Sequence, residues 1–286
     1  MHGWTWRIML TAAALCMPAA ATWAFDDAKY PALDGQWTRA IVPGAVGQPP
    51  FDPTKPPGVG QQAPLTAEYQ AKFEAIRAAR AASGLGDVVS TNCLAPGMPM
   101  MMQAYAPMQI TVLPETTYIL IDYVHESHRR IFTDGRSWPE AVRPTFTGYS
   151  IGKWIDEDGD GRYDVLEAET RYFKGPRFFD SSGIPLHEDD ESVIKERIYL
   201  DKADRNLLHD EMTVFDHALT RPWTVMKNYR RTLDALADWP EYICNEKIPF
   251  INIGNEAYTV SEDGYLMPTR KNQPAPDPRY FNPPKK

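Results

Sequence analysis

Hydrophobic and polar residues alternate with a period of two from about residue 108 to residue 231. This period is typical of β-strands that bury one face. Short turns separate the alternating segments, and locally connected strands favour an antiparallel meander that closes into a barrel or a strongly curled sheet. The sequence therefore predicts a mainly β fold. The predicted strands are 108–113, 117–125, 128–133, 147–155, 163–173, 193–200, 207–216 and 223–231.

One helix precedes these strands. Thr66 can cap it, and Tyr69, Phe73 and Ile76 recur at the spacing of one helical face. Gly84 can end it, so the pattern predicts a helix over residues 67–83.

The regions around the helix and strands are rich in proline and glycine. Residues 41–64 lack any apolar period and indicate an extended strap. We expect a single folded domain with long irregular N- and C-terminal segments. Its predicted parts are a signal peptide at 1–24, a strap with the helix at 25–107, an antiparallel β domain at 108–250 and an irregular tail at 251–286.

The first 24 residues resemble a targeting segment rather than part of the fold. Arg7 precedes an apolar, alanine-rich run at 8–21, and small residues follow at Ala21 and Ala24. This order is typical of a secretory signal peptide, and the run is too short to span a membrane. We expect cleavage after Ala21 or Ala24 and a periplasmic or secreted protein.

Charge and composition exclude several classes of protein. The chain has 38 acidic and 30 basic residues and no basic stripe, which argues against nucleic acid as a partner. No second apolar run reaches the length of a membrane span. Nucleophile elbows, phosphate loops and dinucleotide fingerprints are missing from the sequence, so no organic cofactor is indicated.

Export makes a disulfide the expected state of two cysteines. Removal of the signal peptide leaves Cys93 and Cys244, which have one intramolecular pairing available. The bridge would close a loop of roughly 150 residues and stabilise the fold by at most about 5 kcal/mol in the chain-entropy model. Two independently buried thiols are the alternative.

An acidic segment between two predicted strands matches the calcium-loop pattern D-x-[DN]-x-[DN]-G-x5-E without a mismatch. Gly161 permits the sharp turn that such a loop requires. Because strands rather than helices flank the segment, we expect a structural calcium site at a hairpin tip rather than an EF-hand. A solvated acidic turn is the alternative. The expected ligands are Asp156, Asp158, Asp160, the Arg162 carbonyl, Asp164 and, on the outgoing strand, Glu167.

The region from Tyr123 to Arg136 is unusually polar for a strand. Ionisable groups that face the inside of a barrel could transfer protons or bind an anionic ligand. A solvated outer face is the alternative, and two histidines on opposite faces of a strand cannot share a metal. The catalytic candidates are His125, Glu126, His128, Arg129 and Arg130, and the ligand-binding candidates are Tyr123, Arg136 and Trp154.

A methionine cluster precedes the first predicted strand at Met98, Met100, Met101 and Met102. Thioether clusters can bind copper, but no His or Cys interleaves with this one to complete a site. Adaptable packing under a loop is the interpretation that we favour.

Three strings together resemble a group of exported bacterial proteins of unknown function. They lie at residues 130–136 (RIFTDGR), 148–154 (GYSIGKW) and 218–223 (ALTRPW). This resemblance implies no particular activity. Separately, Gly35-Gln36-Trp37 is similar to the Gly-x-Trp that opens the first strand of lipocalin-like barrels, which implies a calycin-like barrel. The strap and the helix after Trp37 depart from that pattern.

These observations lead to three hypotheses of function. The first is an exported barrel that binds a small, partly apolar molecule and is stabilised by calcium and a disulfide. The second is a cofactor-independent periplasmic lyase, isomerase or hydrolase that uses a His/Arg/carboxylate cluster. The third is an envelope interaction module. The character of the cavity discriminates among them, because convergent ionisable groups indicate catalysis and a mainly apolar pocket indicates binding.

Overall fold

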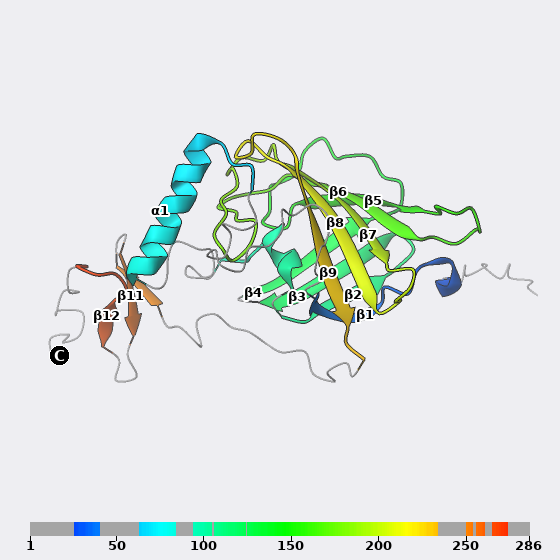
Figure 1. Ribbon diagram of the computed structural model, residues 1–286, viewed down its shortest axis with the longest axis horizontal. Coiled ribbons are helices and arrows are strands. Elements are labelled where there is room, and N and C mark those ends of the chain that lie inside the picture. Colours follow the sequence, from blue (N-terminus) through cyan, green and yellow to red (C-terminus); the bar gives the residue numbers. More distant parts are fainter. Residues whose placement is uncertain are drawn as a thin grey trace, which may run out of the picture.

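The main body of the protein is a closed β-barrel of nine strands, which confirms the predicted mainly β fold (Figure 1). The computed structural model describes residues 26–40, 63–83, 94–104, 106–123, 125–233, 250–253, 256–260 and 265–273. The predicted signal peptide, Cys93, Cys244 and residues 41–62 of the strap lie outside the described residues.

The barrel strands follow chain order, and each strand pairs with the next one. The bounds of β2 to β9 agree with the predicted segments to within a few residues, because the alternation that predicts them also decides which face is buried. They are β1 (Gly35–Ala40), β2 (Met108–Val112), β3 (Thr116–Tyr123), β4 (His125–Phe132), β5 (Tyr149–Ile155), β6 (Val165–Arg171), β7 (Val193–Leu200), β8 (Leu207–Phe215) and β9 (Trp223–Arg231).

Strand β1 closes the barrel by pairing with both β2 and β9. Trp37 lies opposite Met108 on one side and opposite Arg231 on the other. The predicted boundary of the β domain at residue 108 is therefore wrong, since a barrel strand lies in the region assigned to the strap. One isolated strand of six residues gives too short an alternation to be recognised as part of a distant sheet.

The junction between β4 and β5 departs from the predicted antiparallel meander, because these two strands run parallel. Only Ile131–Ser150 and Phe132–Ile151 are paired there. A parallel pair needs a long connection, and residues 133–148 supply it. The sequence could not distinguish this return path from a loop within a meander.

Aromatic and methionine side chains fill the barrel interior. Trp37 is fully buried and donates its Nε1–H to the Leu33 carbonyl oxygen at 2.8 Å. The buried Tyr229 hydroxyl donates to the Met102 carbonyl oxygen at 2.6 Å. Each such apolar side chain, when fully buried, contributes about 1.5–3 kcal/mol to folding.

The methionine cluster lies in this core. The short 3-10 helix η3 (Met100–Gln103) carries three of its members, and all four are at most 3% exposed. Met98, Met101 and Met102 pack in the main core, while Met100 packs with Phe178. Their positions support the packing interpretation over a copper site, because flexible thioethers fill irregular space.

Helix α1 (Ala67–Ser83) has the bounds that the sequence predicts. The Thr66 hydroxyl accepts a hydrogen bond from the Tyr69 backbone N–H at 3.4 Å, as a helix-capping residue does. Tyr69 and Phe73 are buried along one face. The 3-10 helix η1 (Asp27–Lys29) precedes β1. Among the helices of the described residues, none combines the length and apolar character of a membrane span.

Three short strands form a second sheet near the C-terminus: β10 (Phe250–Ile253), β11 (Glu256–Val260) and β12 (Leu266–Pro268). The prediction that residues 251–286 are irregular is therefore wrong for these strands. Strands of three to five residues leave too few alternating positions to stand out from turns.

Candidate functional site

Two rows of outward-facing side chains cross four neighbouring strands, β5 to β8. Residues opposite each other on paired strands share a face, so the register determines which side chains align. The two rows are separated by one residue of the opposite face on each strand. The first row is Ile151, Glu169, Lys195 and Thr213, and the second row is Lys153, Glu167, Arg197 and Glu211.

Opposite charges pair along both rows. In the first row, a Glu169 carboxylate oxygen lies 3.4 Å from Lys195 Nζ. In the second row, Glu167 accepts a hydrogen bond from Arg197 Nη1 at 2.6 Å and lies 2.9 Å from Lys153 Nζ. The Lys153 ammonium is the main reason that the pKa of Glu167 is lowered. These pairs fix the direction of long side chains that would otherwise be free.

The connection between β4 and β5 supplies the wall beside these rows. Arg136 donates from Nε to Asp134 Oδ1 at 2.8 Å and from Nη1 to the Tyr149 hydroxyl at 3.3 Å. The hydrogen bonds from Arg136 lower the pKa of Asp134 to about 2. The Arg171 guanidinium lies 4.4 Å from the centre of the Trp138 ring. Both Arg136 and Trp138 are therefore held in place by contacts with the barrel wall.

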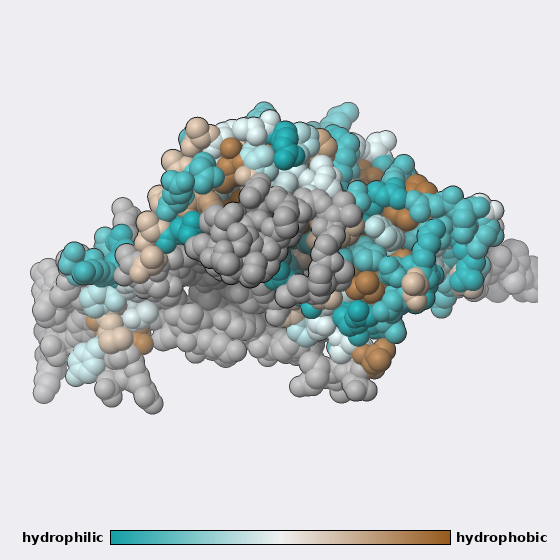
Figure 2. Space-filling model, in the orientation of Figure 1, coloured by the Kyte–Doolittle hydropathy of each residue, from teal (hydrophilic) through white to brown (hydrophobic). Residues whose placement is uncertain are grey.

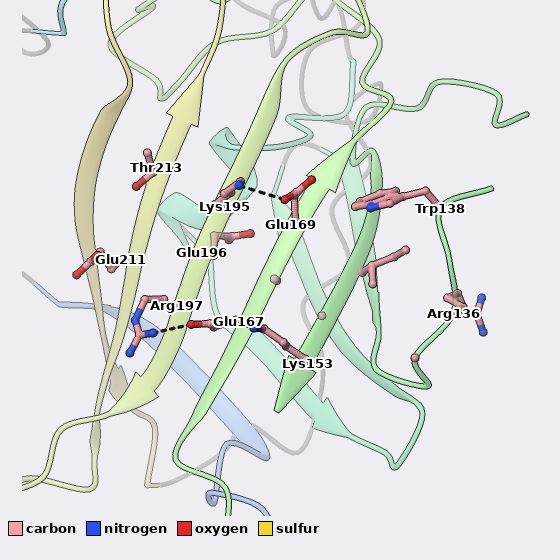
Figure 3. Close-up of a pocket in the computed structure, with 14 residues that line it drawn as sticks. Arg136, Trp138, Lys153, Glu167, Glu169, Lys195, Glu196, Arg197, Glu211 and Thr213 are labelled. Atoms are coloured by element: carbon pink, nitrogen blue, oxygen red, sulfur yellow. Dashed lines mark hydrogen bonds and ion pairs between the residues drawn. The ribbon is translucent and has the colours of Figure 1, made fainter. Parts of the chain in front are cut away.

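Together the rows and the wall enclose a groove of about 610 Å³ on the outer side of the barrel (Figure 3). Gly152, Ala168 and Glu196 lie between the two rows and belong to the opposite face of the sheet, so backbone forms the floor there. The indole of Trp138 and the side chain of Ile151 supply apolar contact area. The groove thus combines an apolar side with balanced charges.

The barrel interior carries a second set of charges. The guanidinium of Arg129 on β4 forms a two-pronged pair with the carboxylate of Glu196 on β7, with side chains only 1% and 0% exposed. Arg129 also donates to the hydroxyls of Ser150 at 3.0 Å and Thr170 at 2.7 Å. All of these partners are buried, which favours a structural role for Arg129 over its predicted role in catalysis.

Two more buried ionisable residues, Asp210 on β8 and Lys227 on β9, stand opposite each other in the strand register. Burial raises the pKa of Asp210 well above its ordinary value, and the nearby Glu196 acts in the same direction. Burial also lowers the pKa of Lys227 to about 8. Sequence reasoning missed both residues. The available signal for an inward position was parity, because Asp210 alternates in step with Leu208 and Met212 on β8, and Lys227 does so with Val225 and Tyr229 on β9.

The remaining catalytic candidates are not brought together with Arg129. His128 and Arg130 lie on the exposed face of β4, one residue to either side of it. His125 and Glu126 belong to β4, but their side chains lie outside the described set, as does that of Tyr123. The enzyme hypothesis built on these residues stays a prediction.

The ligand-binding candidates Arg136 and Trp154 occupy different places. Arg136 lines the outer groove. Trp154 lies near one end of the barrel, where its ring is 5.2 Å from that of Tyr30 and 6.1 Å from that of Tyr163. Of the two, Arg136 is the one positioned to contact a ligand in the groove.

The acidic segment forms the turn between β5 and β6, flanked by strands as expected. Asp156 accepts hydrogen bonds from the backbone N–H groups of Gly159 at 2.7 Å and Gly161 at 2.9 Å. Carboxylate oxygens of Asp156, Asp158 and Asp164 lie within 4.8 Å of one another. Hydrophilic surface covers the end of the barrel where this hairpin projects (Figure 2).

The two other expected carboxylate ligands, Asp160 and Glu167, lie outside that group of three. A carboxylate oxygen of Asp160 accepts the backbone N–H of Arg162 at 2.8 Å, as in an ordinary polar turn. Glu167 faces the groove, in its ion pairs with Lys153 and Arg197. The calcium site stays a prediction that rests on the three aspartates and the sequence pattern.

Comparison with known proteins supplies no relative from which a role could be carried over. No family model matches the chain, and no curated protein matches it. The closed nine-strand barrel is compatible with a calycin-like architecture, and the assignment of function therefore depends on the geometry of the groove and the buried charges.

Proposed function

We propose that this is an exported β-barrel protein that binds a small, partly apolar molecule in the groove over β5 to β8. The observation that carries the proposal is the groove itself, about 610 Å³ in volume and bordered by Trp138 and two charged rows. Small-molecule sites of this size typically combine an apolar wall with a few placed polar groups.

The charges of the groove indicate what kind of molecule fits. Lys195 and Arg197 are paired with Glu169 and Glu167, so a strongly charged ligand would have to break existing ion pairs. A neutral or zwitterionic polar group can instead share the hydrogen bonds of both signs. Trp138 would pack against the apolar part. We therefore expect an uncharged or zwitterionic ligand with one aromatic or aliphatic portion.

A thermal-shift screen with a metabolite library, followed by native mass spectrometry, tests the proposal. We expect at least one partly apolar compound to raise the melting temperature and to bind one per chain. Trp138→Ala should remove that shift. The matched control is Arg230→Ala. Arg230 lies on β9, away from the groove, and the change breaks its exposed ion pair with Asp204. A shift that survives Trp138→Ala, or a library without any hit, would count against the groove.

The proposal includes a structural calcium ion at the hairpin tip. It is supported by the sequence pattern and by the closely spaced carboxylates of Asp156, Asp158 and Asp164, since carboxylate oxygens are ligands that calcium prefers. Calcium should raise the melting temperature of the native chain but not of Asp156→Asn/Asp158→Asn. Equal melting temperatures with and without calcium in the native chain would show that the segment is only a polar turn.

Export and the disulfide belong to the same proposal, and both rest on the sequence. We expect the mature protein to begin after Ala21 or Ala24 and to contain a Cys93–Cys244 bridge. Intact-mass analysis under non-reducing conditions measures both features at once. An intact N-terminus in the exporting host, or two free thiols, would contradict the corresponding part.

A further inference from the structure

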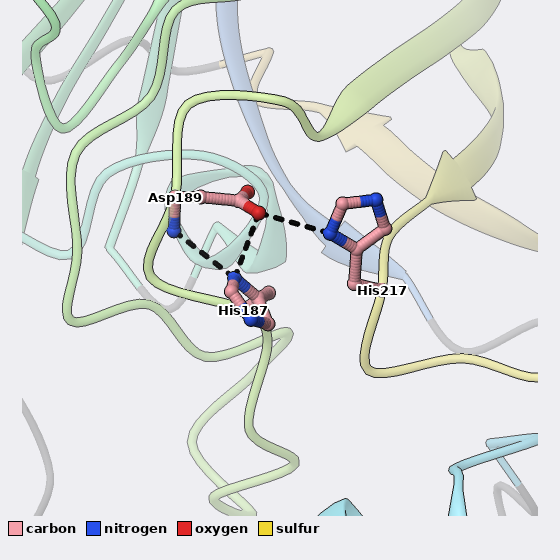
Figure 4. Close-up of side chains that lie close together, drawn as sticks. All are labelled: His187, Asp189 and His217. Carbon is pink, nitrogen blue, oxygen red and sulfur yellow. Dashed lines mark hydrogen bonds and ion pairs between the residues drawn. The ribbon is translucent and has the colours of Figure 1, made fainter.

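Two histidines and an aspartate converge outside the barrel, away from the groove (Figure 4). His187 and Asp189 lie in the connection between β6 and β7, and His217 lies in the turn between β8 and β9. Asp189 Oδ2 is 2.9 Å from His187 Nδ1 and 2.9 Å from His217 Nδ1. Three atoms able to bind a metal therefore meet at one point.

A buried framework holds the two chain segments together beneath this cluster. The guanidinium of Arg177 donates to the carbonyl oxygens of His187 and Asp189 and, at 2.7 Å, to the Ser192 hydroxyl. Asp216 Oδ1 accepts the backbone N–H of His187 at 2.9 Å, and Asp216 itself precedes His217 in the chain. The backbones of all three converging residues are thus positioned independently of their side-chain contacts.

The hydrogen bonding at His187 points to a cation between the rings. The backbone N–H of Asp189 donates to His187 Nδ1 at 3.2 Å, which requires a lone pair on that nitrogen. The same nitrogen faces a carboxylate oxygen at 2.9 Å. The single lone pair of this nitrogen can face either the N–H or a metal, so a cation that takes it over from the N–H and also binds the carboxylate oxygen removes the repulsion between the two acceptor atoms.

We propose that His187, Asp189 and His217 bind a divalent transition-metal ion, with zinc as the best-suited member of the class. Two imidazole nitrogens and one carboxylate oxygen form a donor set that zinc uses with bond lengths of about 2.0–2.2 Å. A carboxylate oxygen of Glu191 lies 3.4 Å from His217 Nε2, so Glu191 can orient the ring through its second nitrogen.

The site keeps one side open. The side chains of His187 and His217 are 37% and 59% exposed, and a hollow of about 330 Å³ lies beside His217. Three protein ligands with an open fourth position are typical of zinc sites that bind water or a substrate. The same arrangement would allow a small anionic molecule to reach the metal beside Arg221, which lines the hollow.

Calorimetric titration of zinc into the chelator-treated full chain tests this site. We expect one zinc ion per chain, and at least a tenfold loss of affinity in both His217→Gln and Asp189→Asn. His128→Gln is the matched control, because it removes an exposed histidine on β4 and should leave zinc binding unchanged. Asp156→Asn/Asp158→Asn should also bind zinc like the native chain.

A second measurement detects the metal ligands in the native chain itself. In the native chain, zinc should shift the Nδ1 resonances of two histidines in nitrogen-detected NMR spectra, and His217→Gln should remove one of them. Absence of zinc binding by the native chain, or a zinc affinity in His217→Gln and Asp189→Asn equal to that of the native chain, would overturn the proposal. Zinc-dependent shifts at Nε2 alone would also contradict it.

Discussion

The inner and outer faces of strands β5 to β8 carry similar residues in opposite circumstances. On the inner face, Glu196 pairs with Arg129 at almost zero exposure, among hydroxyl partners. On the outer face, one residue further along the same strand, Arg197 pairs with Glu167 at 30–39% exposure. Burial therefore makes one pair part of the core and leaves the other available to a ligand.

This difference is the reason for proposing a ligand site on the outside of the barrel. A calycin-like barrel is expected to hold its ligand inside, but here Trp37, Tyr229 and the methionines occupy the described interior. The connection at 133–148 folds against the outer face and builds the groove there. The following predictions test the contrast between the two faces, from the largest expected effect to the smallest.

Arg129→Met should destabilise the fold by about 3–5 kcal/mol, because it leaves the Glu196 carboxylate buried without its partner. Arg197→Met removes a half-exposed guanidinium and should cost at most about 1 kcal/mol. Urea unfolding of both variants measures the two free energies. Equal losses of stability would show that the two faces do not differ as described.

Lys227→Met should destabilise the protein by about 2–4 kcal/mol near neutral pH, because it removes the positive charge that favours the buried Asp210 carboxylate. The double variant Asp210→Leu/Lys227→Met should recover most of this loss, since well-packed apolar residues can replace buried charged groups of opposite sign. Stability of the double variant below that of Lys227→Met would contradict the assignment of this pair.

The same lysine predicts a pH dependence. Its pKa is about 8 in the folded protein and near 10.5 when unfolded, so the unfolded chain binds more protons between these values. The contribution of Lys227 to stability should therefore rise from pH 8 toward 10.5. The difference in unfolding free energy between the native chain and Lys227→Met should change over this range. A difference that stays constant would refute the lowered pKa.

Gly152→Ala should cost about 1–3 kcal/mol, because an added Cβ would lie 2.7 Å from Ile131 Cγ2 and 2.9 Å from the Glu167 carbonyl oxygen. Gly152 stands at the inner face of the sparsely paired junction between β4 and β5. Thermal unfolding is the measurement. An unchanged melting temperature would mean that this junction relaxes more easily than the structure indicates.

Glu211→Gln should change stability by less than about 0.5 kcal/mol, as substitutions at the protein surface usually do. Because Glu211 lines the second row of the groove, the same change should weaken ligand binding by a measurable factor. Comparing the two readouts in one variant separates a groove residue from a structural one. A large loss of stability without any change in ligand binding would show that Glu211 is a structural residue rather than a groove residue.

The strands could be predicted from the sequence because alternation and burial have the same physical origin. Which of the two alternating faces is buried could not be predicted. The sequence places Arg129 on one parity and His128 with Arg130 on the other, but it does not say which parity faces inward. The structure shows that Arg129 does. Only the full set of strand pairings fixes this choice, and they depend on contacts far apart in the chain.

The candidate sites also differ in how far the sequence alone can predict them. The acidic segment at 156–167 is contiguous, so its pattern is visible in the sequence. The groove depends on the register of four strands and on a return path at 133–148. Asp189 and His217 are 28 residues apart and meet through loops without a regular period. Neither arrangement leaves a local signal.

Backbone amide NMR shifts can map where a ligand from the thermal-shift screen binds, and so test binding on the outer face of the barrel. We expect the largest shifts at 151–153, 167–169, 195–197 and around Trp138, which border the groove. Residues of the interior, such as Trp37 and Tyr229, should shift little. Shifts centred on the interior residues, with the groove unchanged, would contradict binding on the outer face of the barrel.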